Sequence, residues 1–287
     1  MSAIGQADDV ALISNDLQSL QGLLDLSLSD CSKYHVTLSS EKTKLQVYSA
    51  KSSELEAFIG KETSLLNIEG RNIAFVDESD HVGVTRSVHG NLPHLLNRFV
   101  AHRRALFSIL PIGLGKNHRG NPAASLIAHS TYCLPVLFSG IPALALKTTE
   151  VDILDQYVKT TVERLQKLQV RTPHCVVMFL GGHLPGKAML HIKLLTVFGM
   201  VCRLPDAFIN KIARYQLTSA KSSSGSWFLQ IRDLCLKYSL PSALSLLQYP
   251  LYYRVSQRTF PTLFWITVFY ICIAFQSTGP LCSGPVH

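Results

Sequence analysis

Two adjacent carboxylates near the start of the chain are the first residues whose type and position could do chemistry. Asp8 and Asp9 lie between small and apolar residues and the apolar run 10–13, a pattern that is typical of a β-hairpin with acids at its turn. Neighbouring strand residues point to opposite faces, so the pair suits one metal ligand and one supporting group. In two-metal sites, Mg²⁺ or Mn²⁺ clamps the attacking and leaving oxygens of a phosphoryl transfer. An acidic hairpin turn without chemistry is the alternative.

A stretch of one charge sign, residues 86–147, is the second candidate feature. It contains no Asp or Glu, and its cations are Arg86, Arg98, Arg103, Arg104, Lys116, Arg119 and Lys147. Such a stretch is typical of a surface that binds a polyanion, with a solvated cationic face as the alternative. Apolar residues at helical spacing from 92 to 106 predict a helix that carries Arg98, Arg103 and Arg104.

The acidic pair is followed along the chain by two further segments, and the order of the three is informative. Residues 38–45 read LSSEKTKL, and residues 81–84 read HVGV. With the string ADDVALI at 7–13, they resemble motifs C, D and E of the reverse transcriptases of non-LTR retrotransposons. Residues 103–106, 135–140 and 168–185 resemble, more weakly, the thumb and the helices that follow it. Gln6, Ser39 and the His81-Val82 pair depart from the residues usual in that family.

The resemblance implies an RNA-directed DNA polymerase that extends a primer by two-metal nucleotidyl transfer. It implies that Asp8 coordinates Mg²⁺ (or Mn²⁺), that Asp9 supports the site, and that Lys42 lies near the phosphates of the incoming nucleotide. The implied partners are an RNA template, a DNA primer and a deoxynucleoside triphosphate.

The same resemblance implies how a template and primer would be held. His81 and Gly83, at the primer grip of motif E, would approach the primer backbone, where glycine permits close contact. Arg98, Arg103 and Arg104 would hold the phosphates of template and primer without reading sequence.

One metal ligand of the family lies outside the matched motifs. The motif A aspartate, which shares the ions with motif C, is found upstream of it, and seven residues precede Asp8 here. Because the ions would lose an anchor, we expect negligible polymerase activity from this chain alone. The alternative is a non-catalytic, basic helical protein that binds RNA or DNA through residues 86–147.

The elements that must position these residues predict an α+β fold. A helix over residues 15–34, with Asn15 or Asp16 as its N-cap, follows the hairpin, and strands are expected near 45–48, 65–68 and 73–76, the last two paired. Helices are predicted over 150–170, ended by residues 171–173, and over 189–203, 205–216 and 226–238. The resulting division is a partial palm at 1–85, a helical thumb-like and connection region at 86–250, and an unassigned apolar tail at 251–287.

Composition excludes several other classes of protein. The 287 residues are 47% hydrophobic and 16% charged with a net charge of +8, which excludes a disordered chain. Seven dispersed cysteines without a CxxC pair predict buried thiols in a reducing compartment rather than zinc ligands. His174, His183 and His191 are expected at helix ends or on the surface. Since no basic leader precedes the first acids, a cytoplasmic or nuclear location is expected.

The last part of the chain leaves three interpretations open. Residues 259–286 carry no charge, and the apolar run 263–275 is shorter than the about 20 residues that a bilayer needs. A tail anchor that contacts a membrane through residues 260–281, a buried segment and a non-native tail remain alternatives.

Overall fold

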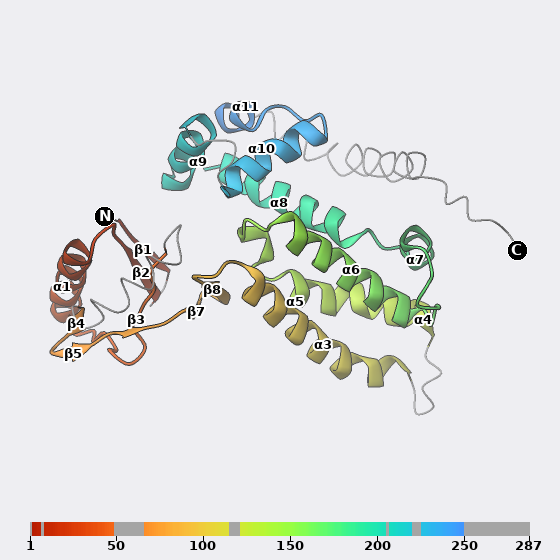
Figure 1. The fold of residues 1–287 in the computed structure, drawn as a ribbon, viewed down its shortest axis with the longest axis horizontal. Helices are drawn as coiled ribbons and strands as arrows, with labels where there is room; N and C mark the ends of the chain where they lie inside the picture. The colour runs from red at the N-terminus through yellow and green to blue at the C-terminus, as the bar shows by residue number, and fades with distance from the viewer. Residues whose placement is uncertain are drawn as a thin grey trace, which may run out of the picture. The chain divides into compact units, whose positions relative to one another are not determined.

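The computed structural model describes residues 2–6, 9–48, 66–114, 121–204, 207–219 and 225–249, with only the backbone of 2–6, 9 and 110–114 (Figure 1). It divides into two compact units. Unit 1 is Met1–Ala105 with Pro135–Gly140, and unit 2 is Leu106–Leu134 with Ile141–His287. The described strands all lie in unit 1, while unit 2 is helical in its described residues, so the α+β prediction is confirmed at this level.

Unit 1 begins with the hairpin and helix that the sequence predicts. Strands β1 (Ser2–Gln6) and β2 (Asp9–Ile13) pair antiparallel, and Gln6 opposite Asp9 leaves a two-residue connection between them. Helix α1 (Leu17–Lys33) starts after Asp16, whose carboxylate accepts the N–H of Ser19 at 2.7 Å. This bond satisfies one of the N–H groups left unpaired at a helix start.

Four short strands of unit 1 pair differently from the prediction. Strand β4 (Asn67–Ile68) pairs antiparallel with β5 (Arg71–Asn72), whereas β6 (Ala74–Phe75) pairs parallel with β3 (Lys44–Leu45). The expected pairing of 65–68 with 73–76 is confirmed at one end only, where the N–H of Ile73 donates to the carbonyl of Leu66 at 2.9 Å, and the rest of it is wrong. The reason is the turn at Glu69 and Gly70, whose φ values of 50° and 79° close a two-residue hairpin and start the return strand at Arg71.

A small apolar cluster holds these elements together. Its buried members are Leu24, Leu45, Leu66, Ile68 and Ile73. Leu24 comes from the inner face of α1, while the others come from β3, β4 and the residues next to β4 and β5. The two-residue strands are thus kept in place by side-chain burial more than by their ladders.

A third hairpin leads into the longest helix of the described residues. Strands β7 (Glu78–His81) and β8 (Val84–Ser87) pair antiparallel, with His81 opposite Val84. Helix α3 (Leu92–Leu114) follows, which confirms the predicted helix with Arg98, Arg103 and Arg104. The boundary between the units, after Ala105, lies within α3.

In unit 2, the central element is α8 (Gly186–Cys202), which packs against η2, α6, α9, α10 and α11. Its Leu190, Leu194, Phe198 and Cys202 are buried. The remaining elements after α3 are α4 (Pro122–Ala128), η1 (His129–Cys133), α5 (Leu134–Phe138), η2 (Ile141–Ala143), α6 (Thr148–Leu165), α7 (His174–Gly181), α9 (Phe208–Ser219), α10 (Trp227–Lys237) and α11 (Ala243–Gln248). The predicted helices at 189–203, 205–216 and 226–238 are confirmed with shifted ends.

Helix α6 ends earlier than predicted. It stops at Leu165, because Lys167 adopts a φ of 57° and the N–H groups of Lys167 and Leu168 return to the carbonyls of Arg164 and Glu163. This is a Schellman motif with lysine in the left-handed position that glycine usually takes. The connection then leads into α7, a helix that sequence reasoning missed.

The cysteine and histidine predictions have mixed outcomes. Cys133, Cys202 and Cys235 are buried free thiols, as expected, but Cys175 is exposed. The prediction for His191 is wrong: it lies inside α8, 8% exposed, with its Nδ1 2.6 Å from the hydroxyl of Tyr238. Since the partner comes from another helix, the helical period alone could not show this burial.

Two stretches within the described residues meet the length and hydropathy test for a membrane span. Pro122–Ala143 does so alone, with a mean hydropathy of 1.3 and 39% of the tested window buried. His174–Gly181 and Gly186–Cys202 do so as a pair bent by 64°. The predicted anchor at 260–281 lies outside the described residues.

Candidate nucleic-acid-binding site

The tip of the β7–β8 hairpin has an unusual backbone conformation. Val82 and Gly83 connect the paired residues His81 and Val84, with φ values of 52° and 73°. Two central residues with positive φ are what a type I′ hairpin turn requires, which suits glycine and strains the β-branched Val82. The turn presents exposed backbone of Gly83 at the hairpin tip.

A chain of hydrogen bonds fixes this hairpin to α3 within unit 1. The hydroxyl of Thr85 donates to Oδ1 of Asp80 at 2.7 Å and accepts from the amide of Asn97 at 3.1 Å. Thr85 is 8% exposed, so its buried hydroxyl is satisfied as both donor and acceptor. The three side chains therefore hold one another across the hairpin and the helix.

A buried histidine on α3 anchors the same hairpin from its other side. Nδ1 of His94 accepts the backbone N–H of Thr85 at 3.0 Å, so Nε2 carries the hydrogen and donates to the carbonyl of Ser139 at 3.1 Å. His94 is fully buried, and this burial lowers the pKa of its ring below the usual value. Gly140 follows directly, with a φ of 76° and no room for a side chain against His94 and Val84. The neutral imidazole thus fixes both the hairpin and the segment of residues 135–140.

Between this hairpin and α3 lies a cavity of about 380 Å³. Its lining residues are Asp80, Gly83, Thr85, Asn97, Arg98, Val100, Ala101 and Arg104. Arg98, Ala101 and Arg104 follow one another at three-residue spacing, which places them on one face of α3. The Nε of Arg98 is buried and makes no hydrogen bond to the described residues. A guanidinium donor in that position suits an anionic oxygen acceptor, such as a phosphate oxygen.

The structure brings three of the predicted nucleic-acid-binding residues into one place. Gly83, Arg98 and Arg104 line the same cavity, although fifteen or more residues separate the glycine from the arginines. His81 ends β7 opposite Val84 and is half-buried, and Arg103 is an exposed residue of α3; neither lines the cavity.

The predicted catalytic residues are described less completely. Lys42 is an exposed turn residue whose backbone N–H donates to the hydroxyl of Ser39 at 3.3 Å. Asp9 is the first residue of β2, seen in its backbone only, and Asp8 lies outside the described residues. Within the described part of the chain, no group of three or more His, Cys, Asp or Glu side chains is placed to hold a metal ion. The two-metal assignment therefore stays a prediction.

Sequence reasoning missed the polar residues that shape the cavity. Asp80, Thr85 and Asn97 are separated in sequence by a turn and a connection. His94 donates to the carbonyl of Ser139, 45 residues further along the chain. The only sequence signal is indirect, namely polar residues on alternate positions of a strand beside a Val-Gly turn.

Comparison with known proteins adds no further assignment. No family model, no curated protein and no solved structure matches this chain. The functional interpretation consequently depends on the residues and geometry described above.

Proposed function

We propose that the β7–β8 hairpin and α3 bind the sugar-phosphate backbone of a nucleic acid, and that the chain is part of an RNA-directed DNA polymerase of the non-LTR retrotransposon type. The observation that supports the proposal is the shared cavity of Gly83, Arg98 and Arg104. The motif resemblance in the sequence predicts that these same residues contact primer and template, and they come from separate elements of the fold.

The chemistry of the cavity fits a phosphate better than a neutral ligand. Two arginines and one carboxylate line the cavity, and the carboxylate, Asp80, already accepts the hydroxyl of Thr85. Arg98 offers a buried N–H that an anionic oxygen would satisfy, and the exposed backbone of Gly83 allows a close approach. Contacts of this kind fix position and do not read sequence, so the expected binding is independent of sequence and sensitive to salt.

The polymerase part of the proposal depends on the β1–β2 hairpin of unit 1. The described pairing of Gln6 with Asp9 supports it, because the sequence resemblance implies that motif C lies in a hairpin. In this proposal, Asp8 and Asp9 hold Mg²⁺ or Mn²⁺, and Lys42 lies near the phosphates of a deoxynucleoside triphosphate. A nucleic-acid-binding protein without catalysis is the second candidate, because the cavity is complete without the acidic pair.

Binding is tested by fluorescence anisotropy with a labelled RNA template annealed to a DNA primer, across a series of KCl concentrations. The double variant R98A/R104A is compared with R71A/K44A, which removes two exposed cations elsewhere in unit 1. We expect R98A/R104A alone to reduce the slope of log affinity against log salt by about 1.4 to 1.8, because each lost phosphate contact contributes about 0.7 to 0.9. Equal slopes for the two variants would exclude the cavity as the binding site.

Metal binding separates the two candidates. Water-proton relaxation enhancement by Mn²⁺ is measured for the wild type, for D8N/D9N and for D25N/D30N, which removes two acids of α1. A polymerase site predicts weaker Mn²⁺ binding in D8N/D9N only. If both variants lose the same amount, the acidic turn has no metal-binding role and the non-catalytic candidate is favoured.

A further inference from the structure

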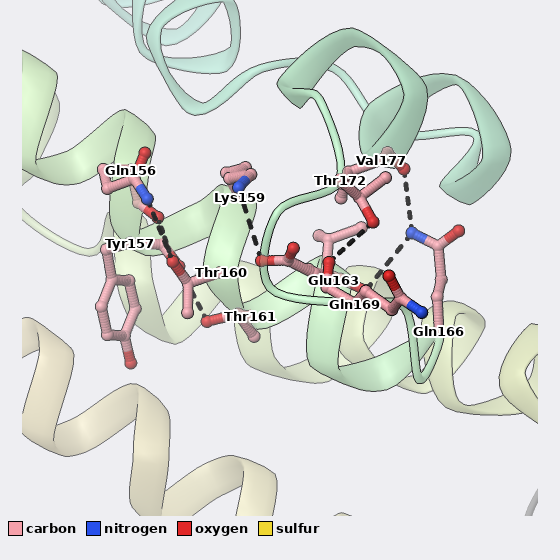
Figure 2. A network of polar contacts seen from close by, with 11 residues as sticks. Gln156, Tyr157, Lys159, Thr160, Thr161, Glu163, Gln166, Gln169, Thr172 and Val177 are labelled. Carbon is pink, nitrogen blue, oxygen red and sulfur yellow. Dashed lines mark hydrogen bonds and ion pairs between the residues drawn. The ribbon is translucent and has the colours of Figure 1, made fainter. Parts of the chain in front are cut away.

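Helix α7 is apolar on both of its faces, but only one of them is packed within unit 2. On its inner face, Val177 is fully buried and Met178 is 4% exposed. The amide of Gln166, at the end of α6, donates to the carbonyl of Val177 at 2.8 Å (Figure 2). A Cβ on Gly181 would lie 2.9 Å from Val162, so α7 lies directly against α6.

The outer face of α7 is an unpartnered apolar surface among the described residues. Phe179 is 79% exposed, Leu180 57% and Val176 39%. Three- and four-residue spacing places them on one side of the helix, and Val170, in the connection from α6, is 85% exposed. Single exposed apolar residues are ordinary, but a helix that is apolar all round is normally covered on every side. We call Val170, Val176, Phe179 and Leu180 the α7 outer face.

The charged residues of the chain segment that carries the α7 outer face are of one sign. Residues 164–205 contain no Asp or Glu, and Arg164, Lys167 and Arg171 are exposed within or beside the α6–α7 connection. An anionic partner is therefore complementary to this surface.

Two carboxylates of α6, Asp155 and Glu163, are already engaged inside unit 2. Asp155 accepts the backbone N–H of Lys187 at 2.9 Å and lies 3.5 Å from Nδ1 of His174. Glu163 is 3% exposed and lies 3.5 Å from Nζ of Lys159 (Figure 2). Their charges are partly balanced before any partner arrives.

We propose that the α7 outer face docks onto an anionic lipid membrane surface. Val170, Val176, Phe179 and Leu180 enter the boundary between headgroups and acyl chains, while Lys167 and Arg171 contact anionic headgroups. Three of the four apolar side chains are aliphatic, which suits acyl chains, and Phe179 is the one aromatic ring among them on which a nucleic-acid base could stack. The proposal is independent of the cavity in unit 1, since it uses only residues of unit 2.

Vesicle flotation of the full chain tests the apolar contribution. F179S/L180S is compared with F208S/L236S, which removes two apolar residues of similar exposure from α9 and α10. On vesicles of phosphatidylcholine with phosphatidylserine, we expect at least about tenfold weaker binding for F179S/L180S and little change for the control. Equal binding of the two variants overturns the proposal.

The ionic contribution is tested with neutral vesicles and with K167S/R171S. Binding should weaken by roughly fivefold for each cation removed, and pure phosphatidylcholine should bind wild type and K167S/R171S alike. K211S/R71S, which removes two exposed cations elsewhere, is the control and should lose less. Undiminished binding of K167S/R171S to anionic vesicles overturns the ionic part.

A local probe gives a readout that the rest of the chain cannot supply. In F179W, the added indole should shift to shorter emission wavelength on anionic vesicles and be quenched by brominated acyl chains, whereas F208W should not change. Absence of quenching in F179W excludes membrane insertion. If F179S/L180S instead abolishes self-association, or weakens RNA binding without affecting vesicle binding, the partner is a second copy or a nucleic acid and the membrane proposal fails.

Discussion

In unit 1, the β7–β8 hairpin packs closely against α3 beside the cavity, and in unit 2, α7 packs closely against α6. The two regions differ in the kind of surface that this packing leaves exposed. In unit 1, Gly140 lets the chain approach His94, and the hydrogen bonds continue from His94 through Thr85 to Asp80, which lines the cavity. In unit 2, Gly181 lets α7 approach α6, and the amide of Gln166 donates to the backbone of both helices. Each region keeps a buried polar atom without a hydrogen bond among the described residues, Nε of Arg98 in unit 1 and Oε1 of Glu163 in unit 2, but the two regions leave different outer surfaces.

This difference follows from which side chains remain at the surface once the inner contacts are made. Around the cavity, the hydroxyl of Thr85 bonds to Asp80 and Asn97, and two arginines line the open space beside them. At α7, the amide of Gln166 bonds to the carbonyl of Val177 on the inner face, and the side chains on the outer face are apolar. A polar ligand is therefore expected at the first region and an apolar contact at the second.

The largest expected effect comes from adding one methyl group at each glycine. In G140A, the new Cβ would lie 2.9 Å from both Nε2 of His94 and Cγ2 of Val84, at a φ of 76°, and we expect a loss of about 3 kcal/mol in the free energy of unfolding. His94 cannot move aside, because both its ring nitrogens are hydrogen-bonded. In G181A, the contacts at 2.9 and 3.0 Å are as short, but the residue is helical and alanine gains about 1 kcal/mol of helix propensity. We expect a net loss of about 1 kcal/mol there.

Urea unfolding followed by circular dichroism measures both variants. G70A is the control for backbone strain, since Gly70 has a φ of 79° and nothing within 4 Å of its Cβ, and should cost about 1 kcal/mol. Hydrogen exchange at the Thr85 amide should accelerate in G140A only, because that N–H donates to His94. The comparison between the regions breaks down if G140A is no more costly than G70A.

Acidification is expected to have an intermediate effect, and it distinguishes a buried histidine of unit 2 from an exposed one of unit 1. Burial lowers the pKa of His191 to about 4, with further lowering by Lys237 and Lys187. Between pH 6.5 and 4, the unfolded chain binds the proton and the folded chain does not, so stability is full above pH 6.5 and falls as the pH is lowered. From pH 7 to pH 5, this one group should cost about 2 kcal/mol.

The variant H191N keeps a polar partner for Tyr238 and removes the titration. Urea midpoints at pH 7 and pH 5 should differ less in H191N than in the wild type. H35N, at an exposed residue of unit 1, is the control for the histidine-to-asparagine substitution itself. An unchanged pH dependence in H191N would mean that His191 is not held neutral by burial.

Local patterns predicted the elements whose cause is local. The hairpin at 2–13 follows from the alternation of its residues, and the cap at Asp16 from a polar side chain three residues before its partner. The helix that carries Arg98 follows from the helical spacing of its apolar residues. The predicted end of α6 was wrong, because Lys167 adopts a left-handed conformation there, which lysine rarely does. Helix α7 was missed because eight nearly all-apolar residues carry no period.

The site was predictable only in part, for a similar reason. Gly83, Arg98 and Arg104 could be selected by residue type and motif, but their meeting at one cavity depends on Thr85 and His94. Those two contacts join the hairpin to the helix and to residue 139, and neither spacing nor composition encodes such a pairing.

The smallest expected effect concerns the hairpin tip, where unit 1 carries strain beside its cavity. Val82 is 45% exposed with a φ of 52°, a conformation that asparagine adopts more readily than a β-branched residue. V82N should therefore raise the free energy of unfolding by about 1 kcal/mol, and V170N, at the exposed valine of unit 2, should not raise it. If V82N is stabilising and leaves nucleic-acid affinity unchanged, the turn serves only to reverse the chain. If it is stabilising and weakens that affinity, the strained tip itself contributes to the ligand contact, because a relaxed turn would no longer hold Gly83 where the cavity needs it.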